Sequence, residues 1–304
     1  MDVSIILVNY NTNGLLIDCV QSICLQTKHV SFEIIIVDNN SNDFCPQDFT
    51  SLYKNIKVIQ LDLNIGFGRA NNEGLKIAQG DYIFFLNSDT ILLNDAVSIL
   101  CNYLKDHISV GICGGNLYTR EKKPNMSYTQ SFPRAVDYIK LLMRFRSGSL
   151  EDDLFNETGQ NMKIGGYISG ADLMIRKELL EKYGGFDPRF FMYFEDVELC
   201  YRIKRKGFEI HSVPSAKIIH LQGASSVLKG ESLKVKSHCH LVKSQFLYFK
   251  ITDSDIVIQF LWFSYLLKSI LALFFYKIIG EKSRIIYWKS NISILKEIYG
   301  EKNV

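Results

Sequence analysis

The chain has 304 residues, of which 47% are hydrophobic and 22% are charged, and its net charge is +3. This composition is that of a folded protein and excludes a disordered chain. The length suits either one large domain or a domain with a helical appendage. Charge is unevenly spread, because residues 201–250 contain ten Lys and Arg but only two Glu. Such a stretch favours a phosphate-bearing ligand or an anionic membrane surface, with a solvated face as the alternative.

The cysteines and the first residues indicate a compartment. Seven cysteines, an odd number, include no C-x-x-C pair, so neither a disulfide framework nor a structural zinc site is expected. The first residues enter a strand-like run and lack the basic and small-residue features of a signal peptide. We therefore expect a protein of the reducing cytoplasm.

The first hundred residues alternate short apolar runs with amphipathic stretches. The runs are rich in Ile, Val and Phe, and they predict buried strands at residues 3–8, 32–37, 56–61 and 82–86. The amphipathic stretches predict helices at residues 15–25, 69–78 and 95–104. This alternation predicts an α/β fold, with a Rossmann-like, mostly parallel sheet covered by helices on both faces.

Polar side chains follow the first, second and fourth of these strands. They are Asn9 and Asn11, Asp38 and Asn40, and Asn87, Ser88 and Asp89. Each is common in turns, but ligands of such sheets bind beyond the carboxyl ends of the strands, where all three groups would meet. The carboxylate of Asp89 is suited to hold Mg²⁺ or Mn²⁺, and through it a diphosphate.

A G-x-G segment opens the helix that follows the third strand. A dinucleotide fingerprint would follow the first strand and would have a third glycine where this chain has Asn71, so we reject that interpretation. The alternative is a tight turn at Gly66 that lets the helix N-terminus and Arg69 approach a diphosphate.

The alternation weakens after about residue 108. Residues 118–159 show no clear period and are expected to form an irregular, acceptor-facing loop. Order returns at residues 165–175, and helices are expected at 177–183 and 194–206, followed by strands at 208–213 and 217–221. In the second of these helices, Glu198 and Arg202 are expected to pair on the exposed side.

An acidic pair, Glu195 and Asp196, begins that helix behind the aromatic-rich residues 190–194. Acidic residues in a first turn commonly only complement the helix dipole. Here the aromatic run could also wall a sugar pocket, in which a carboxylate would deprotonate an acceptor hydroxyl. His220, after the last strand, is a candidate second metal ligand, against the ordinary interpretation as a core or surface histidine.

The C-terminal part changes character. Residues 256–276 are almost all apolar, and Lys268 lies near their centre. A membrane-spanning helix needs about 20 apolar residues and tolerates a central lysine poorly. Flanking Trp, Tyr, Lys and Arg fit better with a helix lying in the membrane interface; the alternatives are packing on the domain or in a homodimer. We expect a catalytic domain at 1–250 and a helical membrane-associating region at 251–304.

Several ordered blocks carry a family resemblance. They are VSIILVNYN (3–11), IVDNNS (36–41), NIGFGRANN (64–72), FLNSDT (85–90), SGA (169–171), GGFD (184–187), FED (194–196) and HLQGAS (220–225). Together they resemble glycosyltransferase family 2, which has the GT-A fold, over about residues 1–225. The detailed pattern is most similar to the bacterial rhamnosyltransferases.

The resemblance implies roles for single residues. Asp38 would contact the nucleobase or ribose, Asp89 would be the metal-binding acid of a D-x-D-like motif, and Asp196 would be the catalytic base with Glu195 beside it. His220 would lie near the diphosphate or the metal. The donor would also contact Asn9, Asn11, Asn40, Gly66, Arg69, Asn71, Asn87 and Ser88. Asn87 replaces the first acid of D-x-D.

The resemblance also implies a reaction. The chain would be an inverting, Mg²⁺- or Mn²⁺-dependent glycosyltransferase that moves a sugar, rhamnose from dTDP-rhamnose being our best interpretation. The acceptor would be a lipid-linked glycan or polysaccharide of O-antigen or capsule synthesis, at the inner face of a bacterial cytoplasmic membrane. A nucleic-acid partner is not expected, because no basic module interleaved with aromatics is present. The alternatives are a UDP-sugar-dependent hexosyltransferase and a non-catalytic nucleotide-sugar-binding protein.

Overall fold

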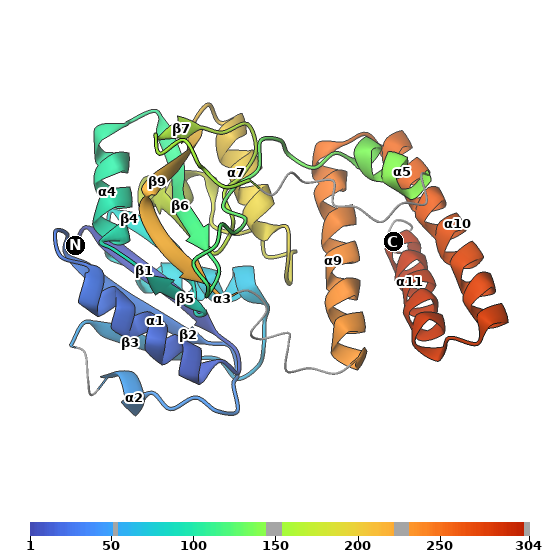
Figure 1. Ribbon diagram of the computed structural model, residues 1–304, viewed down its shortest axis with the longest axis horizontal. Helices are drawn as coiled ribbons and strands as arrows, with labels where there is room; N and C mark the ends of the chain where they lie inside the picture. The colour runs from blue at the N-terminus through green and yellow to red at the C-terminus, as the bar shows by residue number, and fades with distance from the viewer. Residues whose placement is uncertain (51–53, 144–153, 222–230, 301–304) are drawn as a thin grey trace. The chain divides into compact units, whose positions relative to one another are not determined.

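Figure 1 shows the computed structural model, which describes residues 1–50, 54–143, 154–221 and 231–300. The chain packs as two units. The first takes its described residues from Met1–Phe132, Asp152–Phe191 and Glu195–Val227. The second takes them from Pro133–Glu151, Met192–Phe194 and Leu228–Val304. The boundary expected at residue 250 falls inside a helix of the second unit.

The first unit is built on one sheet. Its strands are β1 (Val3–Asn9), β2 (Phe32–Asp38), β3 (Ile56–Gln60), β4 (Tyr82–Asn87), β5 (Thr90–Leu92), β6 (Val110–Tyr118), β7 (Met162–Lys163), β8 (Asp172–Arg176) and β9 (Glu209–His220). They lie in the order β3-β2-β1-β4-β8-β6-β9-β5, and β7 pairs with β9. Strands β3, β2, β1 and β4 pair in parallel, β8 is antiparallel to β4 and β6, and β9 is parallel to β6.

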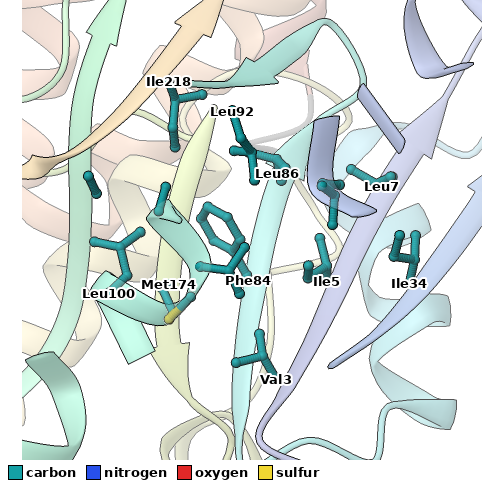
Figure 2. Close-up of a cluster of buried hydrophobic side chains, with 14 of the residues drawn as sticks. Val3, Ile5, Leu7, Ile34, Phe84, Leu86, Leu92, Leu100, Met174 and Ile218 are labelled. Carbon is teal, nitrogen blue, oxygen red and sulfur yellow. The ribbon is translucent and has the colours of Figure 1, made fainter. Parts of the chain in front are cut away.

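Helices cover both faces of this sheet. They are α1 (Asn13–Gln26), α2 (Gln47–Thr50), α3 (Phe67–Ile77), α4 (Ala96–Asp106), α6 (Lys177–Tyr183) and α7 (Glu195–Arg205). Alternate side chains of β1 point to opposite faces, as strand geometry requires. Ile5 lies in the core beneath α1 and α4, shown in Figure 2, whereas Ile6 faces Gly74 of α3. These features confirm the predicted mostly parallel α/β fold with helices on both faces.

Four features differ from the sequence-based expectation. Strand β6 lies where the alternation weakens, and α5 (Ala135–Met143) lies within the loop expected at 118–159. The two strands expected at 208–213 and 217–221 are one continuous strand, β9. The Glu198–Arg202 pair is not on the exposed side, because Glu198 is only 4% exposed and Arg202 also donates to the carbonyl groups of residues 183–185.

The second unit is helical. It contains α5 together with α9 (Glu231–Thr252), α10 (Asp255–Ile279) and α11 (Lys282–Gly300). Trp262 of α10 donates its indole N–H to the Leu295 carbonyl of α11 at 2.7 Å. The segment Met192–Phe194 belongs to this unit as well: the Ser244 hydroxyl donates to the Met192 carbonyl at 2.8 Å, and the Phe194 ring packs on Tyr248. Only α10, among the described helices, is long and apolar enough to cross a membrane.

Candidate active site

The carboxyl ends of β1 and β2 form one polar edge. Asn9 and Asp38 are register partners, and both are buried. The Asn9 amide donates to Asp38 Oδ1 at 2.9 Å and to the Ser41 hydroxyl at 3.1 Å, while Asp38 Oδ2 accepts from the Ser41 N–H at 3.1 Å. The amide of Asn9 thus orients Asp38, whose carboxylate is held as a hydrogen-bond acceptor at the end of β2.

The two turns that follow β1 and β2 are locked together. Asn11 and Asn40 both have positive φ, at 54° and 66°, in the left-handed region that Asn tolerates better than most residues. The Asn11 N–H donates to the Ser41 hydroxyl at 2.8 Å. On the other side, Thr12 and Ser88 hydroxyls lie 3.2 Å apart, which joins this edge to the end of β4. The Asn9, Asp38 and Ser88 positions therefore share one edge, as the sequence predicted.

Asp89 and His220 lie together, Asp89 just after the end of β4 and His220 at the end of β9. The pairing of β5 with β9 places Thr90 opposite His220. As a result, His220 Nε2 lies 3.4 Å from Asp89 Oδ1 and 3.3 Å from the amide nitrogen of Asn87. The side chains of His220 and Asp89 are only 11% and 15% exposed. Residues from two distant parts of the chain thus form one polar pair.

This pair fits a divalent cation. Carboxylate oxygen and imidazole nitrogen are both ligands of Mn²⁺, and Mg²⁺ is commonly held by one or two carboxylates plus substrate phosphates. The Asp89 carboxylate and the His220 imidazole lie close enough for both to contact the same metal ion. Within the described ranges no cluster of three or more His, Cys, Asp or Glu occurs, so the pair would need substrate oxygens to complete the coordination.

Glu195 and Asp196 begin α7, and their surroundings raise the pKa of both carboxyl groups. Asp196 Oδ2 accepts from the Gly170 N–H at 2.9 Å, and Oδ1 accepts from the Val197 N–H at 2.8 Å. Glu195 is 6% exposed, and its Oε2 is buried with no hydrogen-bond partner among the described residues. The backbone N–H groups favour the charged form of Asp196, and nothing comparable is aimed at Glu195 Oε2.

The two carboxyl groups therefore differ in their affinity for a proton. Burial, and then the negative charge of Asp196, raise the pKa of Glu195 to about 8. Burial also raises the pKa of Asp196, against the opposing effect of the Val197 and Gly170 N–H groups. With a pKa of about 8, Glu195 holds its proton near neutral pH. A carboxylate with a raised pKa is a stronger proton acceptor, which suits a general base.

A short series of hydrogen bonds through Gly170, Ala171 and Asn87 connects Asp196 with the Asp89–His220 pair. Gly170 binds the Asp196 carboxylate, and the carbonyl of the next residue, Ala171, accepts from the Asn87 N–H at 3.0 Å. Asn87 in turn contacts His220. A Cβ atom at Gly170 would lie 2.7 Å from Asp196 Oδ2, so the absence of a side chain there allows the approach.

Residues in and around the G-x-G segment form hydrogen bonds with other parts of the protein. Asn71 donates to the Phe67 carbonyl of its own helix, and Arg69 donates to the Pro188 carbonyl at 2.5 Å. Asn39, which the sequence analysis did not select, is 2% exposed and donates to Asn64 at 3.0 Å. Gly66 has a φ of 91°, and its turn brings the Phe67 N–H to the Phe191 carbonyl at 2.9 Å.

Replacing Gly66 with Ala is expected to destabilise the first unit by about 2–4 kcal/mol. The Cβ atom would lie 2.2 Å from the Phe191 carbonyl oxygen, in a backbone conformation that L side chains rarely adopt. Thermal unfolding measures the effect. Gly14→Ala is the matched control, because a Cβ there meets nothing within 4 Å; equal stability of the two variants would contradict the prediction.

Sequence reasoning did not select Thr12, Ser41 or Gly170. Ser41 and Gly170 lie inside the quoted blocks, IVDNNS and SGA, and that placement was the available signal. Thr12 carries no motif of its own. Its position at the N-terminus of α1, directly after the polar end of β1, is the only feature that singles it out.

Comparisons with known proteins identify the family of the chain. The family model described as Glycosyl transferase family 2 matches residues 4–184. The rhamnosyltransferase WbbL of Escherichia coli is 28% identical over 196 residues, covering 61% of this chain and 72% of that protein. The N-acetylglucosaminyl-diphospho-decaprenol L-rhamnosyltransferase of Mycobacterium tuberculosis is 25% identical over 222 residues, covering 64% and 67%.

A solved structure agrees at the level of the fold. The mannosyltransferase PcManGT of Pyrobaculum calidifontis, in complex with GDP-Man and Mn²⁺, superposes with a TM-score of 0.55 at 15% identity, covering 97% of this chain and 84% of that one. The family model spans more than half of the 304 residues and includes the edge formed by Asn9, Asp38 and Asp89. The chain belongs to glycosyltransferase family 2 and is a glycosyltransferase enzyme close to the rhamnosyltransferases.

Proposed function

We propose that the chain is an inverting rhamnosyltransferase that uses dTDP-rhamnose and a lipid-linked acceptor in the synthesis of a bacterial surface glycan such as O-antigen or capsule. The observation that supports the proposed transfer chemistry is the short path from Asp196 through Gly170 and Ala171 to Asn87, which connects the proposed base with the proposed metal ligands Asp89 and His220. The rhamnose assignment is supported by the relatives named as rhamnosyltransferases.

In the proposed reaction, Asp196 accepts the proton of an acceptor hydroxyl while the oxygen attacks the anomeric carbon of the donor sugar. The bond between that carbon and the diphosphate oxygen breaks in the same step, so the configuration inverts and no covalent enzyme intermediate forms. Asp38 would orient the nucleoside. Asp89 and His220 would hold Mg²⁺ or Mn²⁺, which supplies positive charge to the departing diphosphate when bound.

Release of nucleoside diphosphate from candidate donors tests the proposal. With Mg²⁺ or Mn²⁺ and a polyprenyl-diphosphate-linked N-acetylglucosamine acceptor, we expect turnover of dTDP-rhamnose at least about tenfold faster than of UDP-glucose, UDP-GlcNAc or GDP-mannose. Preference for a UDP-sugar would overturn the rhamnose donor and favour the hexosyltransferase alternative. Binding of donors without any transfer to the acceptor would contradict the proposed acceptor.

We also propose that α10 holds the enzyme on the inner face of the cytoplasmic membrane. Seven of its exposed apolar side chains recur every three or four residues, so they share one helix face. They are Ile256, Phe260, Phe263, Leu267, Ile270, Phe274 and Ile278, and each is between 47% and 71% exposed. The opposite face, with Ile258, Leu261 and Ser269, is buried. One apolar face of this length suits an interfacial helix.

Replacing Phe260, Phe263 and Phe274 together by Ser is expected to weaken binding to vesicles containing phosphatidylglycerol by about tenfold or more. Cosedimentation measures it. A triple Ser variant at Leu25, Leu63 and Ile108 is the control, because these are equally exposed side chains of the first unit. An equal loss of vesicle binding in both variants, or no loss in either, would contradict the proposed role of α10.

A further inference from the structure

A cavity of about 360 Å³ lies at the end of β9 and has His220 in its wall. Leu15 of α1 lines it, and so do Arg120 and Asn125 from the hairpin that follows β6. Because His220 also contacts Asp89, the cavity and the Asp89–His220 pair share a side chain. A ligand group held by that pair would therefore lie next to the cavity.

The hairpin holds Arg120 in a fixed position on the backbone. Tyr118 and Pro124 form a bridge, the Thr119 N–H donates to the Lys123 carbonyl at 2.8 Å, and the Lys122 N–H donates back to the Thr119 carbonyl at 2.9 Å. The Asn125 amide donates to the His220 carbonyl at 3.4 Å, which joins the base of the hairpin to the end of β9. The cavity wall is thus a connected piece of structure.

The guanidinium group of Arg120 is available to a ligand. It is exposed, and it forms no hydrogen bond or ion pair with any residue that the structure describes. The charge of Glu121, the only acidic side chain in the described wall, interacts with that of Arg120, but its carboxylate accepts its side-chain hydrogen bond from the Thr119 hydroxyl at 3.0 Å. With Lys122 and Lys123 beside it, the hairpin tip has an excess of positive charge.

A further cation beside the Asp89–His220 pair would favour the proposed reaction. Breaking the sugar–oxygen bond leaves an additional negative charge on the diphosphate, and the charge of Asp89 offsets half of that of a divalent metal. Arg69, the other arginine that the sequence placed near a diphosphate, donates to the Pro188 carbonyl. Arg120 has a free planar donor fork, and this geometry matches phosphate oxygens in a bidentate arrangement.

We propose that Arg120, with Asn125, forms a diphosphate-binding subsite next to the Asp89–His220 pair. The inference rests on the proposed function, because it takes the ligand to be a diphosphate of that reaction. Two sources share this chemistry: the nucleoside diphosphate of the donor and the diphosphate of a lipid-linked acceptor. Arg120 is thus a binding residue that the family resemblance did not supply.

The test is equilibrium binding of four probes with Mg²⁺ present: inorganic pyrophosphate, dTDP, dTMP and farnesyl diphosphate. The proteins are the full chain, Arg120→Ala, Arg120→Lys and Lys123→Ala. Lys123→Ala is the matched control, because it removes one positive charge from the same hairpin outside the cavity wall. We expect Arg120→Ala to weaken pyrophosphate binding by about tenfold or more, with Arg120→Lys intermediate and Lys123→Ala within about twofold of the wild type.

The other probes separate the sources. If dTDP binding weakens with pyrophosphate while dTMP does not, the subsite serves the donor; if only pyrophosphate and farnesyl diphosphate binding weaken, it serves the acceptor. Unchanged binding of all diphosphates to Arg120→Ala, or equal losses in Lys123→Ala, would overturn the inference while the proposed function stands. If the wild type binds no dTDP, the proposed function fails, and the pyrophosphate result alone then decides whether Arg120 forms an anion site.

Discussion

Replacing Asp196 with Asn is expected to lower the rate of sugar transfer by about a thousandfold while leaving dTDP binding within about twofold of the wild type. Asn has nearly the same shape, and its single amide oxygen can still accept one of the Gly170 and Val197 N–H hydrogen bonds that the two oxygens of Asp196 accept. It cannot take up the acceptor proton. Transfer is measured as turnover at saturating donor, and binding by calorimetry; an equal loss of dTDP binding would contradict the assignment.

Glu195→Gln is the matched control, one residue away in the same turn. Burial and the charge of Asp196 raise the pKa of Glu195 to about 8, so this side chain is neutral at pH 7 and Gln resembles its natural form. We expect transfer by this variant to remain within about threefold of the wild type. A loss as large as that of Asp196→Asn would reverse the roles of the two carboxyl groups.

The pH profile distinguishes the pair in a second way. Asp196 must be ionised to act, and burial raises its pKa, so kcat/KM is expected to fall with decreasing pH at a value above the ordinary aspartate range. Glu195 ionises as the pH rises through about 8, which places a second negative charge beside Asp196. Glu195→Gln is expected to remove that alkaline change and keep the acid one. Because the two groups interact, the measured values belong to the pair.

The strands that the sequence predicted well are those buried on both faces. Strands β1, β2 and β4 are continuous runs of large apolar side chains, so their pattern is unambiguous. Strand β6 was missed because it contains Gly111, Gly114 and Gly115, which weaken a strand pattern. Tertiary packing requires these glycines: a Cβ at Gly115 would lie 2.5 Å from the Ala216 carbonyl oxygen. The sequence around Gly115 does not indicate that Ala216 packs against it.

Strand β9 was divided in the prediction because Pro214 interrupts it. In the structure the strand continues, since the pairing with β6 shifts register between Gly114 and Asn116, where a bulge accommodates residues that do not pair. This continuity matters for function. The second half of β9 ends at His220 and pairs with β5, so the irregularity at Pro214 lies within the strand that delivers His220 to Asp89.

The candidate site was predictable only in part, for a related reason. The sequence alone shows that polar residues follow β1, β2 and β4. Because parallel strands present their carboxyl ends at one edge, it also predicts that these residues meet. The contact of His220 with Asp89 depends on an antiparallel pairing that no local pattern encodes. The separation of Glu195 and Asp196 likewise depends on Gly170, which is distant in sequence and supplies a backbone N–H to only one of them.

Replacing Asp89 with Ala is expected to lower transfer by about a hundredfold or more and to remove the metal-dependent part of dTDP binding. Asp89 is the only carboxylate in contact with His220 among the described residues, so its loss leaves a single imidazole ligand that cannot hold Mg²⁺ or Mn²⁺ alone. Calorimetric titration of dTDP with Mn²⁺ and with a chelator measures the difference. Asp106→Ala, at the exposed end of α4, is the control.

The variant His220→Ala shows which kind of site this is. If the pair is a metal site, both single variants should lose the response of dTDP binding to Mn²⁺, and Asp89→Ala should lose more, because a carboxylate supplies charge as well as a ligand atom. If the pair is only an ion pair between β5 and β9, both variants should lower thermal stability and leave the response to Mn²⁺ intact. Asn87 replaces the first acid of the D-x-D pattern, so in a metal site Asp89 and His220 would have to provide the metal affinity together.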